Sequence, residues 1–523
     1  MANGKNKYGQ YMTPEIVVNF MVSLANLKSD SSILEPSSGE GIFLDVLKNK
    51  GYKNITAYEI DKGIIKNNEN VINESFISAN IENGFDLIIG NPPYIRWKNL
   101  EQELKDELSN NELWSKYCNS LCDYSSIFII KAIELLNENG QLIFITPEYW
   151  LNTTHSITLR NYMLDHGYFE EIYHFNETPI FEKATVSTII FKFIKSSKKQ
   201  NKKIKIAKYF KNKKLNESIL ENLKNKVKQP DTEYIELDKF EKNENWILAQ
   251  NEIIAELKIF ENNCKKKNTD NLFSEEFFTI KDFCDIGNGM VSGLDKAFQI
   301  DVEQLNNDEK KYLIKVIKAK SLEPFTHNGI TDYFLIPEGD IKNEEDFIKK
   351  CPNLYEALKT HKEKLNNRYQ YNREIKFWEW VFLRNYNLFS KNEPRIFVPC
   401  KERISNKNHF RFSFIESGIY PTQDVTAIFP KKETEENIYY ILALLNSKFV
   451  FDWLRFNGIV KGNIVEFSEK PIASIPYRKI DFNNIDEKTA HDNIVKYTKI
   501  YIENKNNNDL EKVAIEFNKL FNI

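Results

Sequence analysis

The sequence predicts an α/β fold, with a mostly parallel sheet covered by helices on both faces, followed by a mixed α+β domain and a helical C-terminal tail. Three observations predict it. The chain has 523 residues, enough to bury at least two cores. Short β-branched runs alternate with helical patterns in its first part. Later, aromatic and β-branched runs are interrupted by Asn and Pro without a repeating strand-helix rhythm.

The first domain is predicted to span residues 1–196. It opens with an amphipathic helix over residues 14–27, which begins with a proline suited to a first helical turn. Strands are then expected at residues 32–35, 55–59, 76–79, 86–90 and 141–146. A helix over residues 123–137 precedes the last of these, and two strands at residues 169–175 and 185–193 close the domain.

The rest of the chain is predicted to form three segments. Residues 197–285 are a basic connecting region, residues 286–480 a second domain, and residues 481–523 a helical tail with apolar residues at helical intervals. Between Lys192 and Lys228, 14 Lys stand against two Glu, a local excess of positive charge that could attract a phosphate backbone. The alternative is an ordinary solvated surface.

Composition and motifs exclude several classes of protein. With 41% hydrophobic and 28% charged residues, the chain falls in the globular range. Its apolar runs are too short to span a bilayer, and its polar N-terminus lacks the apolar core of a secretory signal, so we expect a cytoplasmic protein with no membrane partner. The six Cys form no C-x-x-C and the seven His no H-E-x-x-H, so we expect no metal site.

The motif with the most chemical content is Asn91-Pro92-Pro93-Tyr94, which directly follows the apolar strand at residues 86–90. Two consecutive prolines stiffen the backbone, so a carbonyl and a side-chain amide can be held in fixed geometry. The Asn91 side-chain oxygen and the Pro92 carbonyl could accept both protons of one exocyclic base amine and localise its lone pair for attack on a methyl group. Tyr94 could stack on the base. The alternative is a turn with incidental prolines.

A second set of residues indicates a cofactor that contains adenosine. Residues 33–44 read as a strand, a turn with Gly39 and Gly41, and a helix start, where backbone can approach a ligand closely. Eighteen residues beyond Gly41, the next strand ends in Glu59-Ile60, the position at which an acid binds ribose hydroxyls.

Taken in order, these motifs resemble the gamma class of DNA adenine-N6 methyltransferases, the TaqI-like type II modification enzymes. The resemblance implies S-adenosylmethionine as the cofactor and a Rossmann-like seven-stranded methyltransferase domain. It places Thr13, within residues 8–14, near the methionine end of the cofactor. Glu35 matches the acid near its amino group and Glu59 the acid on its ribose. Asn80 appears at the position where the family has an Asp on the cofactor adenine, and an amide oxygen can still accept from that amine.

The same resemblance implies the catalytic residues. Asn91, Pro92 and Tyr94 match the family's catalytic turn, and Pro93 is expected to face the cofactor. Phe181 matches the aromatic residue that holds the target base from its other face. The alternative for Phe181 is an ordinary core position.

Residues 286–480 resemble the family's DNA-specificity region more loosely. The signs are residues 293–298, residues 444–447, and Lys461-Gly462 leading to Ile475-Pro476. Between them, residues 368–373 and 376–380 interleave basic and aromatic side chains, as DNA contacts often do. Taken singly, most of those aromatic residues fit a core position better than a contact.

The resemblance implies an enzyme that transfers a methyl group to the N6 amine of an adenine flipped out of a short duplex sequence, in a cleft between the two domains. It implies double-stranded DNA as the partner, allows for a cognate restriction endonuclease acting on the same site, and is consistent with a monomer. Two alternatives stay open: a modification subunit that needs a separate specificity protein, and an RNA or protein-glutamine methyltransferase, which share the Asn-Pro-Pro-aromatic turn. A fused nuclease or a purely DNA-binding protein is disfavoured, because no nuclease carboxylate cluster is evident and the turn is intact.

Overall fold

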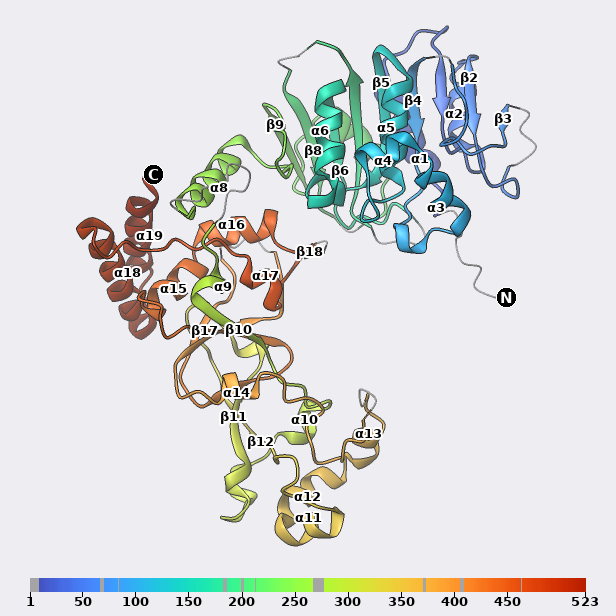
Figure 1. The fold of residues 1–523 in the computed structure, drawn as a ribbon. Coiled ribbons are helices and arrows are strands. Elements are labelled where there is room, and N and C mark those ends of the chain that lie inside the picture. Colours follow the sequence, from blue (N-terminus) through green and yellow to red (C-terminus); the bar gives the residue numbers. More distant parts are fainter. Residues whose placement is uncertain are drawn as a thin grey trace. The chain divides into compact units, whose positions relative to one another are not determined.

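The structure, a computed structural model, describes residues 9–65, 70–82, 84–181, 186–198, 202–211, 213–266, 277–369, 373–404, 409–461 and 463–523. Positions 8, 185, 370–372 and 462, which the sequence motifs and the predicted closing strand include, lie outside the described residues. The chain divides into two compact units, residues 1–254 and 255–523 (Figure 1).

A mixed sheet of nine strands forms the centre of the first unit, in the order β3-β2-β1-β4-β5-β7-β6-β8-β9. The strands are β1 (Ile33–Glu35), β2 (Ile55–Tyr58), β3 (Val71–Ile72), β4 (Phe85–Gly90), β5 (Leu136–Pro147), β6 (Gly167–His174), β7 (Thr188–Lys195), β8 (Ile204–Tyr209) and β9 (Thr232–Leu237). Strands β1 to β5 pair in parallel, and β7 runs antiparallel between β5 and β6. The strand order reverses at β1, between β2 and β4, which is where ligands bind in open α/β sheets.

Helices cover both faces of this sheet (Figure 1). The helices α1 (Glu15–Leu24), α2 (Ile42–Asn49) and α7 (Glu217–Lys224) share one core, and α3 (Gln102–Ser109), α4 (Glu112–Tyr117), α5 (Ser125–Leu135) and α6 (Ile157–His166) share the other. Within β4, Leu87 and Ile89 belong to the first core and Ile88 to the second. Successive side chains of a strand point to opposite faces, so residues 87–89 of β4, which are buried on both faces, are all apolar.

Three sequence predictions for this unit were wrong. The sheet has nine strands and not seven, because β8 pairs with β6 and β9 with β8. For the same reason, the first compact unit extends to Ile254 and does not end near residue 196, so the predicted basic connecting region supplies part of the sheet. The expected strand at residues 76–79 is a turn, and the third strand is β3 instead. Phe76 and Ala79 are apolar because they contact the core.

The second unit is mixed α+β. Within the described residues it contains three small sheets, ordered β10-β17-β13-β15, β12-β11-β16 and β14-β19-β18. The strands are β10 (Cys284–Asn288), β11 (Leu313–Ile317), β12 (Thr331–Phe334), β13 (Arg395–Pro399), β14 (Lys401–Arg403), β15 (Ser413–Ile415), β16 (Ile419–Pro421), β17 (Val425–Pro430), β18 (Val460–Lys461) and β19 (Ile464–Glu466).

The helices of the second unit fall into a short internal set and a C-terminal pair. The internal ones are α9 (Ile280–Phe283), α10 (Asp295–Phe298), α11 (Glu344–Lys350), α12 (Pro352–Lys359), α13 (Lys362–Asn366), α14 (Tyr386–Phe389), α15 (Ile438–Leu445), α16 (Lys448–Asn457) and α17 (Glu469–Ala473). The pair α18 (Ile485–Asn504) and α19 (Asn507–Phe521) forms the predicted helical tail, and α8 (Asn251–Asn263) crosses the division between the units. Of the helices in the described part of the chain, none combines the length and apolar character needed to cross a membrane.

Candidate functional site

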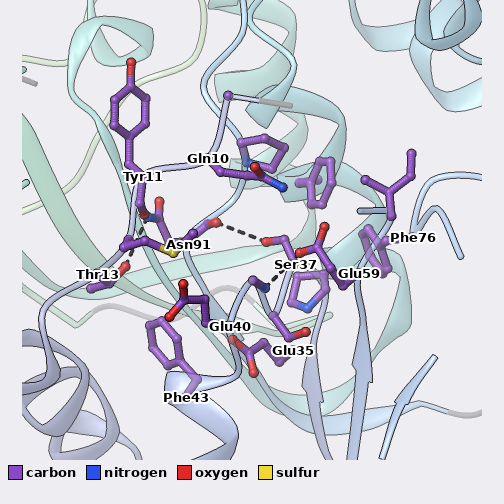
Figure 2. Close-up of a pocket in the computed structure, with 18 of the residues that line it drawn as sticks. Gln10, Tyr11, Thr13, Glu35, Ser37, Glu40, Phe43, Glu59, Phe76 and Asn91 are labelled. Carbon is purple, nitrogen blue, oxygen red and sulfur yellow. Dashed lines mark hydrogen bonds between the residues drawn. The ribbon is translucent and has the colours of Figure 1, made fainter. Parts of the chain in front are cut away.

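A pocket of about 200 Å³ lies in the first unit at the carboxyl ends of β1, β2 and β4, and Figure 2 shows its lining. Its walls come from the segment before α1, from the β1–α2 turn, and from the residues that follow β2, β3 and β4. Seven of the predicted site residues line it: Thr13, Glu35, Gly39, Glu59, Ile60, Asn91 and Pro93. These residues are far apart in the sequence, and the reversal of strand order at β1 brings them together.

The β1–α2 turn is built by two glycines. Gly39 and Gly41 have φ angles of 55° and 92°, in the left-handed region that favours glycine. Gly41 is the N-cap of α2 and does not line the pocket, so its role is to shape the turn. Gly39 lies on the pocket wall, where the turn exposes backbone to a ligand.

Glu59 links this turn to the end of β2. One of its carboxylate oxygens accepts from the backbone N–H of Gly39 at 2.8 Å, and the other accepts from that of Asp61 at 2.9 Å. Burial raises the pKa of Glu59, and these backbone hydrogen bonds oppose the shift. The carboxyl group therefore lines the pocket in a defined orientation, with lone pairs left to accept from a hydroxyl.

Glu35 is the most unusual side chain of the pocket. It is fully buried at the end of β1, and neither of its carboxyl oxygens has a hydrogen-bond partner among the described residues. Burial, with repulsion from Glu59 and Asp45, raises the pKa of Glu35 well above its ordinary value. The hydroxyl of Ser38, which also lines the pocket, is likewise buried without a partner in the described part of the chain. Buried polar groups are seldom left unpaired, so this end of the pocket is suited to a cationic, hydrogen-bonding ligand.

Asn91 lies directly after β4 and is held from three directions. Its side-chain N–H groups donate to the backbone oxygen of Tyr11 at 2.7 Å and to the hydroxyl of Thr13 at 3.1 Å. The Ser37 hydroxyl donates to the Asn91 backbone oxygen at 3.0 Å (Figure 2). The Asn91 side-chain oxygen is buried and has no partner among the described residues. The donor half of the amide is therefore occupied, and the acceptor half is available.

Three aromatic rings, those of Tyr11, Tyr94 and Phe181, form a cluster beside Asn91, which we call the aromatic trio. The rings of Tyr11 and Tyr94 are stacked, with centroids 5.6 Å apart, and Phe181 contacts both. The Tyr94 hydroxyl donates to the backbone oxygen of Ile145 at 2.7 Å, which anchors that ring to β5. Neither Tyr94 nor Phe181 lines the pocket, and neither does Pro92, which is buried in the turn.

Asn80, which was predicted to contact the cofactor adenine, is not among the residues that the structure brings to the pocket. Asn80 is exposed and lies outside the pocket. The wall after β3 is formed instead by Ser75 and Phe76, because the third strand ends earlier than the sequence pattern indicates and the chain then turns towards the pocket. Sequence reasoning missed both residues, and it assigned no role to Tyr11, although Tyr11 lies within the segment 8–14 that the resemblance singled out.

Several side chains of the basic and aromatic segments of the second unit have structural roles, whereas Tyr369 is exposed. Phe377, Trp378 and Trp380 are buried in its core. Arg368 donates to the backbone oxygens of residues 292, 376 and 379, so its guanidinium ties loops together. The reading of these aromatic residues as core is confirmed. Within the described residues, no group of three or more His, Cys, Asp or Glu is arranged to hold a metal ion.

Comparison with known proteins adds three findings. Residues 16–181 match the family described as Eco57I restriction-modification methylase. The chain is 45% identical to the Type II methyltransferase M.HindII of Haemophilus influenzae over 99% of its own length and 98% of that protein. It is 43% identical, with the same coverage, to the Type II methyltransferase M.HincII of Haemophilus influenzae.

A solved structure shares the fold. It is described as the Type IIL restriction-modification enzyme MmeI in complex with DNA, and it matches 97% of this chain and 71% of its own with a TM-score of 0.53. The sequence identity is 12%, so the likeness concerns the mixed α/β fold alone.

Proposed function

We propose that this chain, which belongs to the family of Type II methyltransferases of restriction-modification systems, is a DNA adenine-N6 methyltransferase of the gamma, TaqI-like class that uses S-adenosylmethionine. One observation carries the proposal: Asn91 has both its amide hydrogens occupied and its oxygen free and buried, beside a pocket that contains the unpaired Glu35. The free Asn91 oxygen can accept a hydrogen bond from an amine of the substrate, and the adjacent pocket can hold a methyl donor.

The pocket fits S-adenosylmethionine. When bound, this cofactor supplies an electrophilic methyl group on a sulfonium. The unpaired Glu35 carboxyl suits the cationic α-amino group of its methionine part, where a buried charge pair with hydrogen bonds would satisfy both groups. Glu59 suits the ribose hydroxyls. We assign the adenine ring to the wall at Ser75 and Phe76 in place of Asn80, with Ile60, Thr13, Gly39 and Pro93 as further contacts.

In the proposed mechanism, Asn91 and Pro92 activate the target amine. The Asn91 side-chain oxygen and the Pro92 carbonyl each accept one N–H of the adenine amine, which localises its lone pair towards the methyl group. Asn91 cannot rotate its NH₂ group towards the substrate without losing the bonds to Tyr11 and Thr13. Duplex DNA hides the amine inside the base stack, so the target adenine must first be flipped out. Tyr94 and Phe181 then hold the flipped base by stacking.

We further propose that the second unit reads the DNA sequence around the target. A reading domain in the same chain supports a stand-alone enzyme over a modification subunit with a separate specificity protein. Double-stranded DNA is then the substrate of a monomer, and a restriction endonuclease for the same site is the expected counterpart in the cell.

The proposal is tested by expressing the wild-type chain in a host that lacks adenine methylation and mapping its genome by single-molecule sequencing. We expect N6-methyladenine at one short motif and at no other. Methylation of cytosine at one motif would keep the DNA enzyme and overturn the adenine assignment, because a cytosine amine also carries two protons. No methylated base, with purified protein still binding S-adenosylmethionine, would overturn the stand-alone DNA enzyme.

Thr13→Val tests whether the Thr13 hydroxyl orients the Asn91 side chain. The isosteric change removes one acceptor of the Asn91 amide, and the loss of one hydrogen bond predicts a fall in kcat of about threefold to tenfold. Thr13→Ser, which keeps the hydroxyl, should restore most of kcat. The affinity for S-adenosylmethionine, measured by calorimetry, separates this role from a direct cofactor contact. A loss confined to cofactor affinity would contradict the positioning role.

A further inference from the structure

The aromatic trio leaves no room for a base in its present arrangement. The ring centroids of Tyr94 and Phe181 are 6.1 Å apart and their planes are inclined at 66°, so the rings touch edge to face. Two rings that enclose a flat base must be nearly parallel and about 7 Å apart, which is twice the contact distance of carbon atoms. A base can therefore enter between Tyr94 and Phe181 only if the trio rearranges.

Tyr11 stacks on the ring of Tyr94 and also contacts Phe181. Its ring lies at 26° to that of Tyr94, a stacked geometry, with centroids 5.6 Å apart. Its ring is also 5.6 Å from that of Phe181, so Tyr11 contacts both rings that the proposed function assigns to the base. A stacked ring on Tyr94 is the same kind of contact that a purine would make there.

Of the three side chains, that of Tyr11 is the least constrained. Phe181 is buried, and the Tyr94 hydroxyl is anchored to Ile145. The Tyr11 ring is half-buried, and its hydroxyl makes no hydrogen bond within the described residues. Figure 2 shows this ring pointing away from Glu35 and Glu59.

The backbone of Tyr11, by contrast, is fixed. Its carbonyl oxygen accepts from the Asn91 side chain at 2.7 Å, and the Gly9 oxygen accepts from the Tyr94 backbone N–H at 3.4 Å. Rotation about the Cα–Cβ bond moves the ring without moving the carbonyl. The ring can thus leave its place while Asn91 stays oriented.

We propose that Tyr11 is a placeholder for the target base: its ring fills the base site in the DNA-free enzyme, and the flipped adenine displaces it. The inference rests on the proposed function and identifies a residue that sets the cost of base entry. Removing the Tyr11 ring should increase the affinity for DNA that inserts a base into the site. It should not increase the affinity for DNA that has no base at that position.

The test compares two duplexes that carry the methylation motif found by sequencing, one with the target adenine and one with an abasic site in its place. Their Kd values are measured with saturating S-adenosylhomocysteine for wild type, Tyr11→Ala and Tyr11→Phe. In Tyr11→Ala, the ratio of the adenine Kd to the abasic Kd should fall by about threefold to tenfold, the size of one aromatic contact. Tyr11→Phe keeps the ring and should keep the wild-type ratio.

An unchanged ratio in Tyr11→Ala, or a ratio that rises, would overturn the proposal, since a rise would mean that Tyr11 supports the bound base. If Tyr11→Ala does not fold, Tyr11→Leu retains apolar bulk without an aromatic face and should lower the ratio in the same direction. Methylation of the adenine duplex by wild type is the prerequisite: its absence would count against the proposed function, whereas its presence with an unchanged ratio would count against the placeholder alone.

Discussion

Asn91→Ala is expected to lower kcat by about 100-fold to 1000-fold, the usual cost of removing one transition-state contact in a buried site. The side-chain oxygen of Asn91 is free and buried at the start of the reaction, so its bond to the amine strengthens as charge develops on the nitrogen. The affinity for S-adenosylmethionine should change by less than about twofold, since the contacts assigned to the cofactor lie elsewhere in the pocket.

The measurement combines single-turnover methylation of the motif duplex with calorimetry of cofactor binding. Asn161→Ala is a matched control, because Asn161 lies on α6 and bonds to Asn243 in an exposed position of the same unit. Its kcat should equal that of wild type. If Asn91→Ala kept more than a tenth of the wild-type kcat, the turn would not supply the activation that we assign to it.

Glu35→Gln is expected to weaken S-adenosylmethionine binding by about 100-fold, in the range found when one partner of a buried charge pair is removed. Glu35 is fully buried and otherwise unpaired, so the α-amino group of the cofactor is the partner that we assign to it. Glu40→Gln is the matched control, because Glu40 also lines the pocket but is exposed, where water screens its charge. We expect Glu40→Gln to change the affinity by less than about fivefold.

The raised pKa of Glu35 predicts that the affinity for S-adenosylmethionine depends on pH. Because burial raises the pKa of Glu35, the free enzyme retains a proton there above the ordinary range of a glutamate. A bound cation favours the carboxylate, so binding releases this proton, and the wild-type affinity should rise with pH until pH exceeds the raised pKa. Glu35→Gln should lack this rise. Calorimetry in two buffers of different ionisation enthalpy measures the proton directly, and equal proton release in wild type and Glu35→Gln would contradict the assignment.

Local sequence patterns were sufficient for the central features of the first unit. The run from Ile33 to Leu44 encodes a strand, a glycine turn and a helix in consecutive residues, and the turn at Asn91 follows its strand directly. Glu59 could be found in the same way, since it ends a strand at a regular distance from the glycine turn. In each case the chemistry lies within or next to one element, so spacing along the chain is enough to locate it.

Other features depended on packing between segments that are distant in sequence. Strands β8 and β9 join the sheet edge although exposed Lys205 and buried Lys208 interrupt the apolar pattern of β8. Phe377, Trp378 and Trp380 are buried although their pattern resembles a DNA contact. Ser75, and not Asn80, lines the pocket because the position at which β3 ends decides which residue after it meets the pocket. The unpaired state of Glu35 and the contact of Tyr11 with Phe181 are likewise tertiary, because burial and ring stacking are set by neighbours that no local pattern specifies.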